Sequence, residues 1–259
     1  MTDADELLTI LAVTRFAGRP HALLERSGGV AVAVQIDPSE ARDAWTEARA
    51  LLGATGRWPV AITTWPQQAP ADWQASVQQL LDPKGFVGKD RPSVETILRG
   101  AVGLDLKAVF AGLEDETWAE MLAEEADGDV AAAAHEMQYW FEPSEDQPTA
   151  MMFLPTPAPW ASVAFESWYA EDDPQTGAAQ LVALLKRWHD AYGAELVAHW
   201  GTMLQFHVER PPRDIEQARA LAREQLLVAP CTALLPGTHP EMHAAALMRS
   251  NSWFLHERP

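Results

Sequence analysis

A strand–helix–strand pattern in the first quarter of the chain constrains the fold more than any other feature of the sequence. Residues 28–36, GGVAVAVQI, are short, apolar and β-branched, and a glycine pair and an Asp-Pro bound them, which predicts a buried strand. A helix follows, because Asp37 is a good N-cap, Pro38 suits the first helical turn and Glu40 takes the third helical position of a capping box. Residues 58–65, WPVAITTW, predict the next strand. Together these elements predict a β-α-β unit, which is right-handed where its two strands are parallel.

A helix followed by a β-hairpin is predicted around residue 193. Apolar side chains recur at helical spacing before Gly193, which stands where a left-handed C-terminal cap belongs. Residues 194–200 and 203–210 then flank Gly201-Thr202, a two-residue loop with glycine first. That loop is typical of a type II′ turn between antiparallel strands.

The register of this hairpin decides what its two histidines can do. With Gly201-Thr202 as the turn, His199 pairs with Leu204 and His207 lies opposite Leu196. Because successive side chains of a strand alternate between faces, the two imidazoles then point in opposite directions. We therefore expect core or edge histidines here, and no shared metal ion.

The end of the chain completes a helix–hairpin–helix–strand unit. Asp214 caps a further helix with Gln217 at its third position, and residues 252–256 read as a closing strand. Strands and helices thus alternate along most of the chain. This alternation predicts an α/β or α+β fold with a mixed sheet and flanking helices.

A polar break divides the sequence into two regions. Residues 142–148, EPSEDQP, separate an N-terminal α/β region, 1–145, from a C-terminal α+β domain, 150–259, which opens with a strand at 150–155. The N-terminal region includes an acidic helical segment at about 101–150. We expect two regions packed tightly together or one compact unit.

Seven segments of the sequence carry a family resemblance: RWHDAYGAELV (187–197), ERPP (209–212), ALAREQ (220–225) and WFLH (253–256), with LPTPAPW (154–160), ESWYAEDDP (166–174) and TGRWPV (55–60) upstream. These segments resemble a bacterial family known only as a domain of unknown function, DUF4253. The resemblance is strongest over about 150–259 and implies an α+β domain, without implying any activity. In place of a Cys-Pro-Asp that the family pattern leads us to expect, this chain has Ala229-Pro230-Cys231.

The charge of the chain is unevenly distributed. The whole chain carries a net charge of −18, from 37 acidic and 19 basic residues. Residues 101–150 hold 13 of the acids and one base, so this stretch alone contributes −12. A strongly acidic chain repels phosphate backbones and anionic lipid surfaces, so we expect no nucleic-acid partner.

The sequence also indicates a cytoplasmic location. No apolar run approaches the roughly 18 residues that a membrane span needs, and the N-terminus, MTDADELLTILAVTRF, has acids where a secretory signal has Lys or Arg. A single cysteine, Cys231, excludes an internal disulfide and fits a reducing compartment. With no base or positive charge nearby in sequence, Cys231 is expected to be a buried, inert thiol.

The acidic stretch suggests a non-catalytic interaction protein. Its carboxylates would capture a basic protein partner through complementary charge, as an inhibitor or immunity-like protein does. The alternative is a solvated helix face that serves solubility. The candidate partner-binding residues are Glu114, Asp115, Glu116, Glu120, Glu124, Glu125, Asp127 and Asp129.

A pocket in the C-terminal domain is the other functional hypothesis. It would make the protein a small-ligand binder or a hydrolase-type enzyme, although no nucleophile or nucleotide motif supports catalysis and no cofactor is expected. His239 and His243 lie four residues apart, but Pro240 between them makes His239 a helix cap, so we expect no metal site. The candidate pocket residues are Trp168, His189, Glu195 and Arg210.

Overall fold

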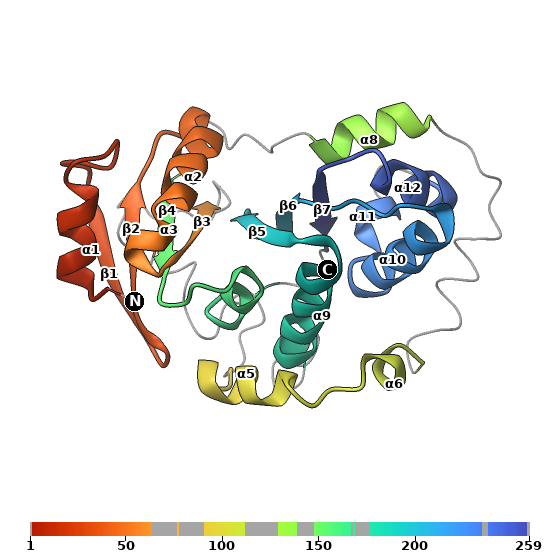
Figure 1. The fold of residues 1–259 in the computed structure, drawn as a ribbon, viewed down its shortest axis with the longest axis horizontal. Helices are drawn as coiled ribbons and strands as arrows, with labels where there is room; N and C mark the ends of the chain where they lie inside the picture. The colour runs from red at the N-terminus through yellow and green to blue at the C-terminus, as the bar shows by residue number, and fades with distance from the viewer. Residues whose placement is uncertain are drawn as a thin grey trace.

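In the computed structural model the described residues form one mixed sheet of seven strands in the order β1-β2-β4-β3-β5-β6-β7 (Figure 1). Neighbouring strands are antiparallel except β3 and β5, which are parallel. The mixed sheet with flanking helices is the predicted fold class. The strands are β1 (His21–Arg26), β2 (Gly29–Gln35), β3 (Trp58–Thr63), β4 (Thr149–Leu154), β5 (Ala194–His199), β6 (Met203–Val208) and β7 (Ser252–His256). The structure describes residues 2–63, 77, 91–111, 129–138, 148–166, 168, 177–234 and 238–257.

Helices lie along the sheet from β1 at one edge to β7 at the other. In Figure 1, α1–α3 accompany the first strands, and α8 and α10–α12 lie beyond β7. Helix α2 packs on β3 and β4, and α9 packs on β5, α5 and η2. No described helix is long and apolar enough to cross a membrane. The helices are α1 (Ala4–Leu11), η1 (Pro38–Glu40), α2 (Ala41–Ala50), α3 (Leu52–Thr55), α5 (Val94–Ala101), α6 (Leu106–Ala111), α8 (Val130–Gln138), η2 (Pro159–Ala164), α9 (Gly177–Tyr192), α10 (Ile215–Val228), α11 (Cys231–Leu234) and α12 (Pro240–Leu247).

The predicted β-α-β unit exists, but its two strands are not neighbours. Strands β2 and β3 run in the same direction, and β4 lies between them, antiparallel to both. All six residues of β4 are buried. A strand that is apolar along its whole length is most stable in the middle of a sheet. This explains why β4, although it comes later in the sequence, lies between β2 and β3.

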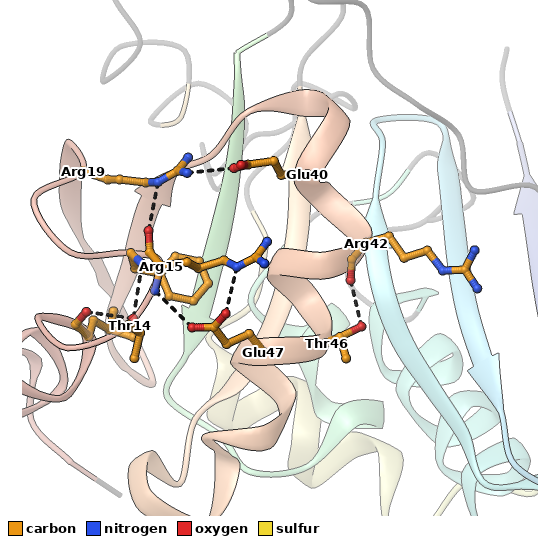
Figure 2. A network of polar contacts seen from close by, with 9 residues as sticks. Thr14, Arg15, Arg19, Glu40, Arg42, Thr46 and Glu47 are labelled. Atoms are coloured by element: carbon orange, nitrogen blue, oxygen red, sulfur yellow. Dashed lines mark hydrogen bonds and ion pairs between the residues drawn. The ribbon is translucent and has the colours of Figure 1, made fainter.

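The loop after α1 is bound to η1 and α2 through two arginines (Figure 2). Arg15 donates from its backbone N–H and its Nε to the Glu47 carboxylate, at 3.0 and 2.8 Å. Arg19 donates to Glu40 at 2.7 Å, so Glu40 does not complete the predicted capping box. Asp37 does cap this helix start, accepting from the Ser39 N–H at 2.9 Å.

The end of α9 is the predicted glycine cap. Gly193 has a φ of +65°, and its N–H donates to the His189 carbonyl at 2.8 Å. A β-carbon at this position would also lie 2.7 Å from the β-carbon of Glu209. Both the backbone conformation and the close approach therefore require glycine.

A β-bulge changes the predicted hairpin register. The β5–β6 pairing shifts between Leu196 and Ala198, so that His207 lies opposite Glu195 and not opposite Leu196 as expected. The turn lies at the predicted place, between His199 and Met203, and Gly201 has a positive φ of +77°. The extra residue of a bulge moves the pairing by one position. The alternation of apolar and polar residues in the sequence does not reveal this shift.

The sheet runs across the predicted domain boundary. Residues 139–147, which include most of the polar break, lie outside the described residues. Strand β4, on the C-terminal side of that break, pairs with β2 and β3 of the N-terminal region. The division into 1–145 and 150–259 stays a prediction about the organisation of the sequence.

Helices α10 and α12 share a buried histidine. His243 is 2% exposed, and its Nε2 lies 2.9 Å from the Gln225 side-chain oxygen. Because an amide oxygen only accepts, Nε2 carries the proton of a neutral imidazole. Burial lowers the pKa of His243 to about 4 from the usual 6.5.

This lowered pKa predicts a pH-dependent stability. The folded protein binds fewer protons at His243 than the unfolded chain between about pH 6.5 and pH 4. The contribution of His243 is therefore present above pH 6.5 and lost as the pH falls toward 4, by about 3 kcal/mol. The unfolding free energy should be measured by urea unfolding at pH 7 and at pH 4 for the wild type and for H243Q. Between these two pH values, the wild type should lose about 3 kcal/mol more than H243Q. Parallel curves for the two proteins would contradict the assignment.

Candidate functional site

The carboxyl ends of β3 and β5 lie together at one edge of the sheet. The two strands are parallel, with Ile62 paired with His199, the last residue of β5. Across the hairpin His199 lies opposite Leu204, as predicted. In open sheets with parallel strands, ligands bind beyond the carboxyl ends of those strands.

A buried carboxylate–imidazole pair occupies this edge. The Nδ1 of His199 lies 2.7 Å from a carboxylate oxygen of Glu166, and the two residues are 3% and 2% exposed. The Nε2 of His199 lies 2.9 Å from the Gly201 carbonyl oxygen, which can only accept, so Nε2 carries a proton. A second proton must lie between Nδ1 and Glu166, because the two atoms would otherwise both be acceptors.

The turn of the hairpin is held against this pair. Trp168, fully buried, donates from its indole N–H to the Thr202 carbonyl at 3.1 Å. The same carbonyl accepts the backbone N–H of Glu257 at 3.0 Å. We refer to Glu166, Trp168, His199, Gly201 and Thr202 as the turn cluster.

Two polar atoms of the turn cluster are buried without a hydrogen-bond partner. They are the second carboxylate oxygen of Glu166, Oε1, and the hydroxyl of Thr202. Burying a polar atom without a partner costs about 1–3 kcal/mol. The turn cluster therefore retains hydrogen-bonding capacity that the described fold does not use.

Comparison with known families places the turn cluster within a recognised region. Residues 150–256 match the family model "Domain of unknown function (DUF4253)". The resemblance predicted from the sequence is confirmed. Neither a curated protein nor a solved structure matches the chain. All members of the turn cluster lie in the DUF4253 region, whereas β3, the parallel neighbour of β5, lies outside the matched residues.

The four predicted pocket residues do not form one site, because each is hydrogen-bonded to a residue other than these four. Trp168 belongs to the turn cluster. His189 is bonded through Nδ1 to the Ala194 carbonyl at 3.1 Å, at the end of α9. Arg210 is exposed and donates to the Asp190 carbonyl at 3.3 Å.

The fourth predicted residue, Glu195, binds a helix of the N-terminal region. Arg49 of α2 donates to both of its carboxylate oxygens, at 3.1 and 2.7 Å. The Arg49 guanidinium also lies 4.9 Å from the ring centre of Trp58. Glu195 thus connects β5, which lies within residues 150–256, to α2, which lies outside them.

The predicted acidic site lies mostly outside the described residues. Seven of its eight residues, all except Asp129, lie outside the described residues. Asp129 is exposed, and its carboxylate accepts the Ala131 N–H at 2.8 Å at the start of α8. The described part of this site is therefore a helix cap.

Sequence reasoning found the fold around the turn cluster but not its chemistry. The sequence predicts a core or edge histidine at His199, and the structure places His199 in the core. Glu166 was not singled out, because 33 residues separate it from His199 and no short motif joins them. The one available signal was that Glu166 opens ESWYAEDDP, a segment that also resembles the family.

The remaining metal and thiol candidates have structural partners. Among the described residues no group of three or more His, Cys, Asp or Glu could hold a metal ion. His239 caps α12 as predicted, with its Nδ1 accepting the Glu241 N–H at 3.2 Å. Cys231 is half-buried and not buried as expected, because it begins α11 beside the end of β7.

The buried pair predicts a strong thermodynamic coupling. Removing one partner leaves the other buried without its proton partner, so E166L and H199L should each cost about 3–5 kcal/mol of unfolding free energy. The double variant should cost about 2 kcal/mol less than the sum, in a double-mutant cycle measured by urea unfolding. As a control, the exposed pair Glu95–Arg99 should show a coupling below about 0.5 kcal/mol. Additive losses at Glu166 and His199 would show that the pair is not coupled.

Proposed function

We propose that this protein binds a small molecule at the turn cluster of its DUF4253 region. The observation that carries the proposal is the Oε1 atom of Glu166, an acceptor that is buried and has no partner among the described residues. Its position at the carboxyl ends of β3 and β5 supports the same conclusion. A ligand donor would supply the hydrogen bond that this oxygen lacks.

Each member of the cluster has a role in such a site. Glu166 accepts from the ligand with Oε1, and His199 fixes the carboxylate by holding Oε2 while its own Nε2 binds the turn. Trp168 fixes the position of Thr202 through the Thr202 carbonyl. The hydroxyl of Thr202 is the second group available to the ligand. These roles describe binding and include no reaction.

The Thr202 hydroxyl supports a ligand site over a purely structural cluster. Valine has the shape of threonine without a polar atom, so a cluster that served stability alone would be better with valine at this position. Groups that lower stability without a local benefit are typical of functional sites. The carbonyls of Gly201 and Thr202 both have hydrogen-bond partners, whereas the Thr202 hydroxyl has none and is such a group.

The test is therefore T202V, measured for stability and for binding. Without ligand, T202V should raise the unfolding free energy by about 1 kcal/mol, because it removes a buried hydroxyl without a partner. Binding is followed through the indole N–H resonance of Trp168, assigned with W168F, on titration with millimolar benzamide, benzamidinium and benzoate. At least one probe should shift this resonance in the wild type and bind about tenfold more weakly to T202V. If no probe shifts it, or if T202V binds as well as the wild type, the proposal is wrong.

We also propose a second function, capture of a basic protein by the acidic stretch. The observation that favours it is the charge count, since residues 101–150 hold 13 acids against one base. Carboxylates at this density attract a basic surface and speed its association. An inhibitor or immunity-like role and a cytoplasmic location fit this proposal. It depends on the sequence alone and is independent of the turn cluster.

This second proposal predicts salt-sensitive binding. The wild type should retain a basic protein from a host lysate at low salt and release it at moderate salt, because exposed charges are screened. A variant with six acids of the stretch changed to glutamine should retain much less of it. A control with six exposed acids neutralised elsewhere should bind like the wild type, and equal binding by all three proteins would reject the proposal. The stretch variant changes Glu114, Asp115, Glu116, Glu120, Glu124 and Glu125, and the control changes Asp5, Glu6, Glu25, Asp43, Glu209 and Glu216.

A further inference from the structure

The protons of the Glu166–His199 pair can be counted from its partners. The Gly201 carbonyl fixes one proton on Nε2, and the 2.7 Å contact between Nδ1 and Glu166 holds the second. If the second proton is on Nδ1, the pair is an imidazolium and a carboxylate. If it is on Glu166, both groups are neutral. The pair has no net charge in either case.

Within the described part of the chain, no third charged group pairs with Glu166 or His199 to balance an added charge. Among the described residues, neither Glu166 nor His199 has an ion-pair partner besides the other. Both side chains are nearly inaccessible, at 2% and 4% exposure. Bringing a charged group into contact with them would leave a net charge in a buried site, which costs several kcal/mol.

The free oxygen of Glu166 accepts a hydrogen bond in both proton arrangements. As part of a carboxylate it is an acceptor, and as the carbonyl of a protonated acid, with the proton on Oε2, it is also an acceptor. An anion without a donor would place a second acceptor against this oxygen, and no hydrogen bond could form between them. The ligand group that meets Oε1 must therefore be an N–H or O–H.

From these two constraints we infer that the ligand of the turn cluster is neutral and presents an N–H or O–H donor to Glu166. This inference rests on the proposed binding function and adds the chemical class of the ligand. A primary amide has one group for each of the two atoms without a partner, an N–H for Oε1 of Glu166 and a carbonyl for the Thr202 hydroxyl. A cation attracted by a lone carboxylate is the alternative that the proton count argues against.

Three probes of one shape separate these possibilities. Benzamide is neutral and has the donor, benzamidinium has the donor and a positive charge, and benzoate is an anion without a donor. In the titration of the Trp168 indole resonance, benzamide should bind at least tenfold more tightly than either of the other two. Tighter binding of benzamidinium or of benzoate would overturn the inferred class while leaving the site in place. Silence from all three probes would instead reject the site itself.

Replacing Glu166 with glutamine gives a second, independent readout. In E166Q the new amide can donate to Nδ1 of a neutral His199, which again leaves a neutral pair with a free acceptor oxygen. Benzamide should therefore bind E166Q within about threefold of its wild-type affinity, whereas E166L should bind it at least tenfold more weakly. Loss of benzamide binding in E166Q, in a variant that unfolds cooperatively like the wild type, would show that the site requires the carboxylate charge, contrary to the inference.

Discussion

The parallel pairing of β3 with β5 is the contact on which the architecture depends. It is the one position in the strand order where the four strands β1, β2, β4 and β3 meet the three strands β5, β6 and β7. Two side-chain contacts support it beside the ladder. Trp58 donates from its indole N–H to the Leu196 carbonyl at 2.8 Å, and Arg49 binds Glu195 with two hydrogen bonds. Without this junction the hairpin would have no parallel neighbour, and the edge with the turn cluster would not form.

The turn cluster follows from this junction and from the stiff connection that precedes it. Residues 155–166 pass from β4 through η2, which packs on both β5 and α9, and this path delivers Glu166 to the end of β5. The hairpin turn supplies the other half, because Gly201 brings its carbonyl to Nε2 of His199. A buried acid is tolerated only where a partner removes its net charge. The position of Glu166 therefore depends on His199, and that of His199 depends on β3.

Local rules predicted most elements but not their neighbours in space. The caps at Asp37 and Asp214, the glycine end of α9 and the Gly201 turn depend on a few adjacent residues, and all four are present. The insertion of β4 between β2 and β3 depends on the whole sheet, and the bulge before Ala198 depends on the packing of one strand. Neither leaves a periodic signal. The Glu166–His199 pair was missed for the same reason, since a contact over 33 residues has no spacing rule.

Most of the negative charge of the chain lies outside the described residues. The described residues hold 21 acids and 16 bases, a net charge of −5 out of −18. Many of these acids have cationic partners within the fold, including Glu40, Glu47, Glu195 and Glu224. The remaining −13 belongs to the residues that the structure does not describe. Like charges raise the free energy of a compact chain, and this cost is consistent with the proposal that the acidic excess serves a partner.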